Sequence, residues 1–130
     1  MLTGRCHCGA VTYEMPAETI HRALCHCADC RRASGAPMVA WAMVSADQLT
    51  INGAPRVYAS SEHGRRHFCE ACGAGLFYTN EVVFPGLIDV QTATLDDPGA
   101  IAPTGQIQVA ERISWMAAAH ELPAFERYPA

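Results

Sequence analysis

The stretch "CHCADC", residues Cys25–Cys30, places three cysteines within six positions of the 130-residue chain. Two doublets, "CHC" with Cys6 and Cys8 and "CEAC" with Cys69 and Cys72, raise the total to seven. Sulfurs spaced by one or two residues can approach one ion from a single tight turn, and an odd number of cysteines cannot pair completely as disulfides. The sequence therefore predicts a fold held together by cysteine-bound metal.

The doublets and the triplet predict two metal sites of different kinds. A structural zinc site takes four thiolates, conveniently two from each of two turns, and the glycines directly after Cys8 and Cys72 suit such turns because they allow positive φ. Three protein ligands with an open fourth position are the pattern of a catalytic zinc. We therefore expect two zinc ions per chain, a structural one on Cys6, Cys8, Cys69 and Cys72 and a catalytic one on Cys25, Cys27 and Cys30.

Three other uses of the cysteines are considered. A disulfide framework is disfavoured by the odd count and by the absence of a visible secretory signal. A thioredoxin-like redox pair requires a CxxC after a strand in a βαβ unit, a pattern that the sequence lacks. A single zinc ribbon remains open, and it would leave three thiols without a role; its ligands would be Cys27, Cys30, Cys69 and Cys72.

Length and composition predict one globular domain over residues 1–130. Half of the residues are hydrophobic and 17% are charged, which argues against disorder. The formal net charge is −4 and all nine basic residues are arginines, so we expect neither nucleic acid nor an anionic membrane as a partner. No signal peptide or membrane span is visible, which predicts a cytoplasmic location in which thiols stay reduced.

The remaining sequence predicts a mainly β fold with few short helices. Helical turns are expected at residues 28–34 and a short helix within 95–101, while residues 122–130 read as an irregular tail. Both Trp41 and Trp115 are expected in the core. Short strands bounded by Gly, Pro, Asn and Asp are predicted at residues 10–15, 19–25, 38–44, 56–60, 75–79, 86–95 and 106–110.

Five stretches together resemble one known family: "GRCHCGAVTYE", "CHCADCRRASGAP", "VYASSEHGRRHFCEACGAGL", "TLDDP" and the closing "W…LPAFE". Their ordered CxC, CxCxxC and CxxCG motifs are similar to those of the glutathione-dependent formaldehyde-activating enzyme family, which includes centromere protein V-like proteins. The resemblance implies a β-tent fold of antiparallel sheets with two zinc ions and the same division of the cysteines. The chain departs from the family pattern at Ala74 and Gln106 and is shorter than members named for the glutathione reaction, so the substrate stays open.

A zinc ion held by three thiolates suits the binding of a further sulfur, because metal coordination deprotonates a thiol. A thiol held there could add to the carbonyl carbon of formaldehyde, and the reverse reaction would cleave the carbon–sulfur bond. We therefore expect a carbon–sulfur lyase that acts on thiol–aldehyde adducts such as S-hydroxymethylglutathione, with a small thiol or its adduct as partner. The alternative is a non-catalytic, zinc-stapled binding module.

Polar residues near the cysteines have two interpretations each. Arginine binds carboxylates bidentately and could hold glutathione, or it could simply face solvent; the candidates are Arg31, Arg32, Arg65 and Arg66. His7 and His26 lie between paired cysteines and are expected to point away from the metal. His63 and His67 could move a proton or supply a fourth ligand, and Ser60 and Ser61 are candidate polar contacts.

Overall fold

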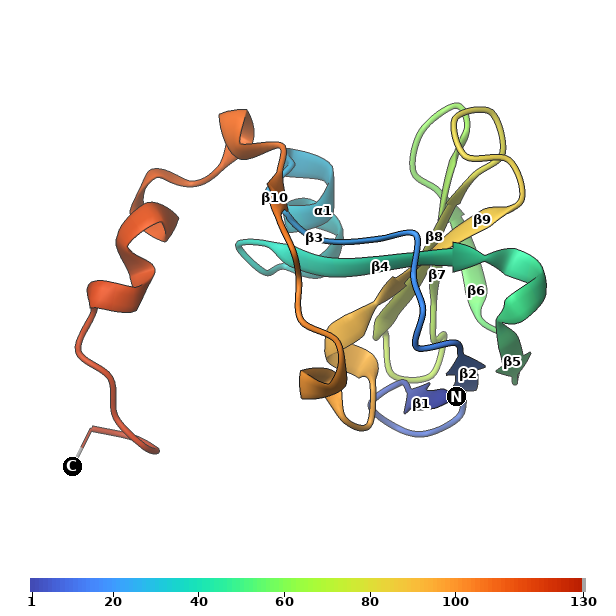
Figure 1. Cartoon of the computed structure of the whole chain (residues 1–130), viewed down its shortest axis with the longest axis horizontal. Helices are drawn as coiled ribbons and strands as arrows, with labels where there is room; N and C mark the ends of the chain where they lie inside the picture. The colour runs from blue at the N-terminus through green and yellow to red at the C-terminus, as the bar shows by residue number, and fades with distance from the viewer. Residues whose placement is uncertain (130) are drawn as a thin grey trace.

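The computed structural model describes residues 1–129, and these residues form a mostly β structure of two sheets (Figure 1). A small antiparallel sheet contains β1 (Leu2–Arg5), β2 (Thr12–Met15) and β5 (Thr50–Asn52) in the order β1-β2-β5. The large sheet has the order β10-β3-β4-β9-β8-β7-β6. Its strands are β3 (His21–Cys25), β4 (Val39–Ser45), β6 (Arg56–Ala59), β7 (Gly64–Phe68), β8 (Gly75–Asn80), β9 (Leu87–Gln91) and β10 (Gln106–Ile107).

Helices are few and short, as predicted. In the described chain the single α-helix is α1 (Ala28–Ser34), at the residues where the sequence predicts helical turns. Short 3-10 segments are η1 (Ala46–Gln48), η2 (Thr92–Thr94), η3 (Pro98–Ala100), η4 (Val109–Glu111) and η5 (Ser114–Glu121). The prediction of a mainly β fold with few helices is confirmed. None of the helices formed by residues 1–129 is long and apolar enough to cross a membrane.

One strand pair differs from the expected antiparallel arrangement. β10 pairs with β3 in parallel, with Gln106 opposite Leu24 and Ile107 opposite Cys25. Residues 92–105 leave the end of β9 and cross the molecule before β10 begins, so the chain returns along β3 in the same direction (Figure 1). This crossover places β10 beside the end of β3, where the cysteine triplet begins.

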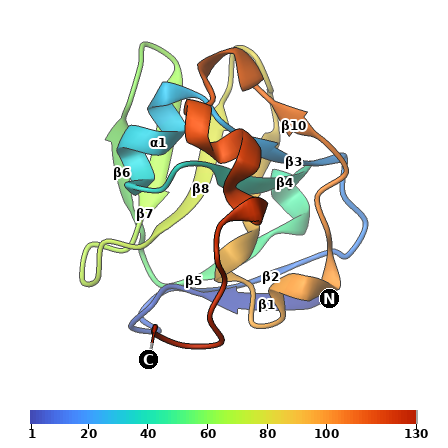
Figure 2. The ribbon, with the colours of Figure 1, turned by 90° about the vertical axis from the view of Figure 1, so that its left-hand side faces the viewer.

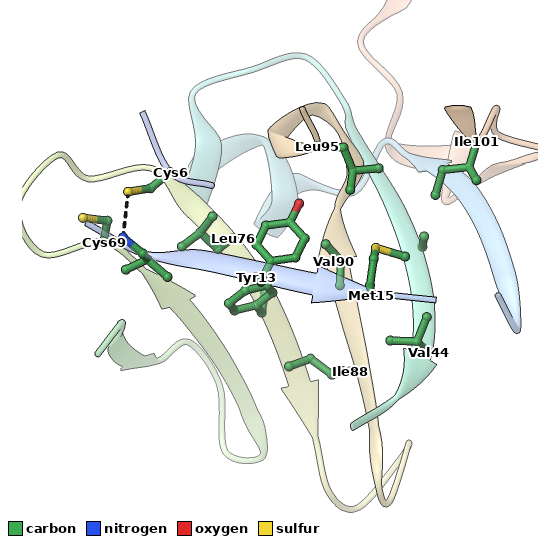
Figure 3. Packing of buried hydrophobic residues seen from close by; sticks show 13 residues of the cluster. Cys6, Tyr13, Met15, Val44, Cys69, Leu76, Ile88, Val90, Leu95 and Ile101 are labelled. Carbon is green, nitrogen blue, oxygen red and sulfur yellow. Dashed lines mark hydrogen bonds between the residues drawn. The ribbon is translucent and has the colours of Figure 1, made fainter. Parts of the chain in front are cut away.

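The main hydrophobic core lies between the two sheets (Figure 3). β2 alternates between exposed and buried positions, so that Tyr13 and Met15 point toward the large sheet. The Tyr13 ring packs edge-on against Phe77, with ring centroids 5.2 Å apart. Two cysteines, Cys6 and Cys69, belong to this core and are each 1% exposed.

A second, smaller cluster lies on the opposite face of the large sheet and contains Trp41, Cys25 and Cys30. Helix α1 covers this face (Figure 2). The Sγ atom of Cys27 caps the helix by accepting a hydrogen bond from the Cys30 backbone amide, and the helix ends at Gly35 in the left-handed conformation. The sheet therefore separates two clusters, each of which contains cysteines.

After β10 ends at Ile107 the C-terminal segment leaves the sheets, and none of residues 102–129 is buried (Figure 1). Trp41 lies in the core as expected, whereas the expectation for Trp115 is wrong because its side chain is 58% exposed. Trp115 belongs to η5, and η5 has no buried residue. Hydrophobicity alone predicts burial of a tryptophan, but burial requires another element to pack against it.

Candidate functional site

Two tight turns bring four cysteines together, and we call this group the four-cysteine site: Cys6, Cys8, Cys69 and Cys72. The first turn is closed by a hydrogen bond from the Gly9 amide to the Cys6 carbonyl (3.2 Å), and the second by one from the Gly73 amide to the Cys69 carbonyl (2.7 Å). Gly9 and Gly73 have φ of 83° and 79°, which confirms the prediction that these glycines adopt positive φ.

The sulfur spacing in the four-cysteine site fits a tetrahedral metal. The Sγ atom of Cys8 lies 3.7 Å from that of Cys6 and 3.8 Å from that of Cys69, and all four sulfurs lie within 4.8 Å of one another. A tetrahedron with zinc–sulfur bonds of about 2.3 Å has edges of about 3.8 Å, whereas a disulfide requires about 2.0 Å. The donor set and the spacing therefore fit a four-coordinate zinc.

Backbone amides surround these sulfurs. The Val11 amide donates a hydrogen bond to Cys6 Sγ (3.3 Å). Hydrogen bonds from the backbone amides of Ala74 and Cys8 lower the pKa of the Cys72 thiol to about 6. Amide donors stabilise the thiolate form, which is the form that binds metal. The loop geometry thus favours the thiolate form of Cys72, whereas the neighbouring sulfurs of Cys6, Cys69 and Cys72 contribute to a raised pKa of about 11 for Cys8.

The second group, which we call the triplet site, contains Cys25, Cys27 and Cys30. Cys25 ends β3, Cys27 caps α1, and Cys30 lies in the first turn of α1, so the strand-to-helix corner points three sulfurs at one place. Their Sγ atoms lie within 4.8 Å of one another. Burial raises the pKa of Cys25 to about 12 and also raises that of Cys27, so a bound dication is needed to hold these buried sulfurs as thiolates.

The zinc-ribbon alternative is wrong. It requires Cys27 and Cys30 to share an ion with Cys69 and Cys72, whereas the structure places these two pairs in different groups. They also belong to separate hydrophobic clusters on opposite faces of the large sheet. Each group could hold one metal ion.

A cavity of about 220 Å³ opens beside the triplet site. Trp41 and Tyr78 form aromatic walls, and Arg66 reaches in from β7. The Arg66 guanidinium lies 5.1 Å from the centre of the Tyr78 ring, and its Nη2 donates to Cys30 Sγ at 3.8 Å. A fixed positive charge beside the three sulfurs offsets the negative charge that thiolates would place there.

Asp89 also lines this cavity, and the sequence analysis missed it. Its residue is 8% exposed, and its Oδ1 atom is buried without a hydrogen-bond partner. Burial raises its pKa to about 6, although His21, with Nε2 3.7 Å from Oδ1, lowers it. The available signal was a lone acid within the otherwise apolar strand sequence "LIDVQ".

The other polar candidates lie elsewhere. The Arg65 side chain donates to the carbonyls of Ser61, Glu62 and Gly64, so it stabilises the β6–β7 turn. Arg31 and Arg32 line a different cavity together with Trp115, and Arg32 also lines one that includes Ser60 and Arg66. Ser61 Oγ accepts a hydrogen bond from the Gly64 amide.

The histidines differ in their surroundings. His7 and His63 are exposed and do not line the triplet cavity, and His63 Nε2 lies 3.7 Å from Glu62 Oε1. His67 Nε2 pairs with Thr79 Oγ1 (3.1 Å), and burial lowers its pKa. His26 is buried and its Nε2 donates to Gln106 Oε1 (2.8 Å).

Neither departure from the family pattern falls in the triplet cavity. Gln106 contacts His26 from β10, and Ala74 lies at the four-cysteine site, where its carbonyl accepts from the Cys69 amide (3.0 Å). Neither residue is therefore part of the wall of the triplet cavity.

Comparison with known proteins identifies relatives. A family model described as "Glutathione-dependent formaldehyde-activating enzyme" matches residues 1–111. An uncharacterized lyase of Schizosaccharomyces pombe is 33% identical over 79 residues, which cover 59% of this chain and 58% of that protein. A Halomonas elongata protein named "Putative glutathione-dependent formaldehyde-activating enzyme" is 32% identical over 88 residues, which cover 59% of this chain and 55% of that protein.

The matches to these two relatives span less than two thirds of the relatives' own lengths. The crystal structure of a Rhodobacter sphaeroides protein superposes with a TM-score of 0.61 at 25% identity, covering 81% of this chain and 99% of that one. The family model spans both cysteine groups and every residue of the triplet cavity. The chain belongs to the glutathione-dependent formaldehyde-activating enzyme family.

Proposed function

We propose that this protein is a zinc-dependent carbon–sulfur lyase that cleaves and forms thiol–aldehyde adducts such as S-hydroxymethylglutathione. The observation that carries the proposal is the triplet site, in which three sulfurs face a cavity. Among residues 1–129, the group of potential metal ligands at this place consists of these three cysteines. A fourth coordination position would then be left for a substrate sulfur, which is the arrangement of catalytic zinc sites.

The two sites have different roles in this proposal. The four-cysteine site would hold a structural zinc, since it offers four ligands and joins the N-terminus to the β7–β8 turn within the main core. The triplet site would hold the catalytic zinc. When bound there, zinc would favour the thiolate form of the substrate and bring its sulfur to the cavity.

The chain's own residues would position the adduct. Trp41 and Tyr78 line the cavity and would exclude water from its side, and Arg66 would supply positive charge near the reacting sulfur. Arg66 also lines two neighbouring cavities of about 230 Å³ and 400 Å³. A thiol as large as glutathione would extend past Arg66 into this space, where Arg66 and Arg32 could pair with its carboxylates.

The names of the relatives support the proposal, since one is called a lyase and another is named for formaldehyde activation. Seven free cysteines also suit a reducing compartment such as the cytoplasm. The proposed partner is therefore a small thiol or its aldehyde adduct.

The test is the exchange rate between free and adducted thiol, measured by NMR exchange spectroscopy with glutathione and formaldehyde. Because the adduct also forms spontaneously, the rate with enzyme is compared with the rate in buffer and with a Cys27→Ser variant. We expect acceleration by the wild type and none by the variant, and thiol addition should change the visible spectrum of the cobalt-substituted protein. A protein that contains two zinc ions but neither accelerates exchange nor binds thiol would be a zinc-stapled binding module.

A further inference from the structure

We propose that Asp89 is the acid–base group of the triplet site. In adduct cleavage its carboxylate takes the proton of the substrate hydroxyl, and in adduct formation its carboxylic acid returns that proton to the aldehyde oxygen. This inference rests on the proposed function and adds a catalytic residue to it.

Strand register places Asp89 on the same face as the triplet site. Asp89 lies opposite Met43 on β4 and opposite Tyr78 on β8, and Tyr78 in turn lies opposite Arg66 on β7. Directly opposed residues in antiparallel strands point to the same face, so Asp89, Tyr78 and Arg66 form one row across the sheet. Cys25 lies four residues after His21, which continues the row on β3, and therefore shares this face. The row and the triplet site lie on one face of the sheet, and Asp89 and the three cysteines line the same cavity.

The fold does not account for a carboxyl group at this position. Burying a polar oxygen without a hydrogen bond costs free energy, and burying a carboxylate costs more. Asp89 Oδ1 has no hydrogen-bond partner in the described chain, and the Nε2 atom of His21 lies beyond hydrogen-bond distance at 3.7 Å. The Asp89 side chain lines the cavity and is 12% exposed, so its carboxyl group can be reached by a molecule that enters the cavity.

The other titratable and charged groups around the cavity are less suited to this step. Arg66 donates to Cys30 Sγ, and Asp29, in the first turn of α1, also lines the cavity but is exposed to solvent. His21 is partly exposed and faces Asp89 from β3. Tyr78 Oη accepts from Asn80 Nδ2 at 3.4 Å, and the three cysteine sulfurs form the triplet site. Asp89 therefore combines an unpaired oxygen with a buried position, and burial raises its pKa to about 6, near the pH at which a general base works best.

The step balances without an oxidant or reductant. In a hydroxymethyl thioether, R–S–CH2–OH, the O–H bond breaks and its proton goes to the Asp89 carboxylate. The electron pair of that bond forms the carbonyl of formaldehyde, and the pair of the breaking C–S bond leaves with the sulfur as thiolate. In the reverse direction the thiolate attacks the carbonyl carbon and protonated Asp89 gives its proton to the oxygen.

The test compares Asp89→Asn with the wild type and with Asp97→Asn, which removes an exposed acid outside the cavity. General acid–base catalysis typically contributes on the order of 100-fold or more, so Asp89→Asn should slow adduct exchange at least about 100-fold. Asp97→Asn should keep the wild-type rate. The cobalt-substituted Asp89→Asn protein should still change its spectrum when glutathione is added, because thiol binding does not need the carboxylate.

The pH profile separates this role from a structural one. The wild-type rate should fall as the pH drops through the range in which Asp89 is protonated, and this acid limb should be absent in Asp89→Asn. His21→Gln should move the limb to higher pH, since the His21 charge lowers the pKa of Asp89. A second measurement uses only the wild type: the carbon-13 carboxyl resonance of Asp89 in the zinc-loaded protein should titrate with the same midpoint as the limb.

The outcomes distinguish the two proposals. If the wild type accelerates exchange and Asp89→Asn does so equally, or if the Asp89 carboxyl stays ionised across the acid limb, the role of Asp89 is overturned and the lyase proposal stands. If the wild type gives no acceleration and thiols leave the cobalt spectrum unchanged, the lyase proposal fails and the role of Asp89 fails with it. If Asp89→Asn does not fold, the carboxyl titration of the wild type decides.

Discussion

The aromatic ring of Tyr13 lies directly against Gly4 on the neighbouring strand, at the centre of the small sheet. A methyl group added at Gly4 would overlap the ring carbons and the hydroxyl of Tyr13. That hydroxyl is also held by Thr94 Oγ1 at 2.7 Å, and the ring packs on Phe77. The ring therefore has little freedom to move away.

We expect Gly4→Ala to destabilise the protein by about 1–3 kcal/mol, the usual cost of overpacking a well-packed core. The measurement is urea unfolding in zinc-containing buffer. Gly105→Ala is the matched control, because nothing lies within 4 Å of a Cβ atom at that position. Equal stability of the two variants would show that Tyr13 can shift without cost.

Asp89 should make stability depend on pH, apart from any role in catalysis. Burial raises its pKa to about 6, with His21 opposing the shift, so the folded protein binds this proton more tightly than the unfolded chain does. The contribution of Asp89 to the free energy of unfolding is thus fully present below the pKa that this group has in the unfolded chain. It is lost as the pH rises through about 6, the pKa of Asp89 in the folded protein. Asparagine at this position does not ionise, so it adds no such pH dependence to the stability.

The stability of Asp89→Asn relative to the wild type should accordingly increase by roughly 1 kcal/mol from about pH 5.5 to about pH 7.5. Urea unfolding of both proteins over this range measures the difference, and Asp97→Asn serves as the control for losing an exposed charge. A pH-independent difference would contradict the raised pKa.

Single residues also show what the sequence can and cannot reveal about the site. Cysteine spacing is local, so the two doublets and the triplet could be recognised as candidate ligand pairs before any strand was placed. Asp89, His21 and Arg66 come from three strands that are distant in the sequence, and only the strand order and register place them in one row. A sequence gives the face of a strand but gives neither its neighbours nor its register.

The turn between β7 and β8 carries two of the four sulfurs in the four-cysteine site, and the N-terminal turn carries the other two. Cys69 is buried in the main core, so its replacement by serine would remove a proposed metal ligand and place a hydroxyl group among apolar side chains. Cys30 lies in the smaller cluster on the opposite face of the sheet. Replacement of Cys69 in the β7–β8 turn and replacement of Cys30 in α1 should therefore change the stability of the protein by different amounts.

Cys69→Ser should unfold or aggregate the protein, because structural zinc can contribute on the order of 10 kcal/mol to folding. Cys30→Ser should remain folded and lower the zinc content from two ions toward one. Thermal unfolding together with elemental analysis under reducing conditions provides the measurement. Equal destabilisation by both changes would mean that the structural and catalytic roles are assigned to the wrong sites.

The elements were predicted unevenly, for physical reasons. α1 and the strands with regular hydrophobic alternation lie close to their expected residues, but β1, β5 and β7 were not predicted. The sequence "GRRHF" of β7 does not predict a strand, since Arg65 and Arg66 are adjacent and both are charged. β7 exists because β6 and β8 pair with it on either side, and such pairing is not encoded within five residues.

Across the molecule, the large sheet separates the two cysteine groups, one within the core between the sheets and one beneath α1. The triplet site opens onto a cavity, whereas the four-cysteine site contributes Cys6 and Cys69 to the core. Because the triplet site offers three protein ligands and the four-cysteine site offers four, a chelator should remove a metal ion from the triplet site first.

Titration with a chelator should release one zinc ion while the fold is kept, and release the second ion only together with unfolding. Zinc release and far-UV circular dichroism, recorded on the same sample, give the two curves. Cys30→Ser should show only the second step. Release of both ions in one step that coincides with unfolding would contradict two independent sites.

The four-cysteine site and the triplet site also differ in the time at which all of their cysteines have been synthesised. Cys25, Cys27 and Cys30 emerge from the ribosome almost together, but Cys6 and Cys8 must wait for a turn that is synthesised more than sixty residues later. At typical elongation rates this delay is roughly 3–13 s. During that time Cys6 and Cys8 lack the other two cysteines of the four-cysteine site, and their thiols are exposed to oxidants and competing metals. Synthesis of this protein is thus most sensitive to redox conditions at its N-terminal doublet, and a nascent chain damaged there would lose the link between its two sheets.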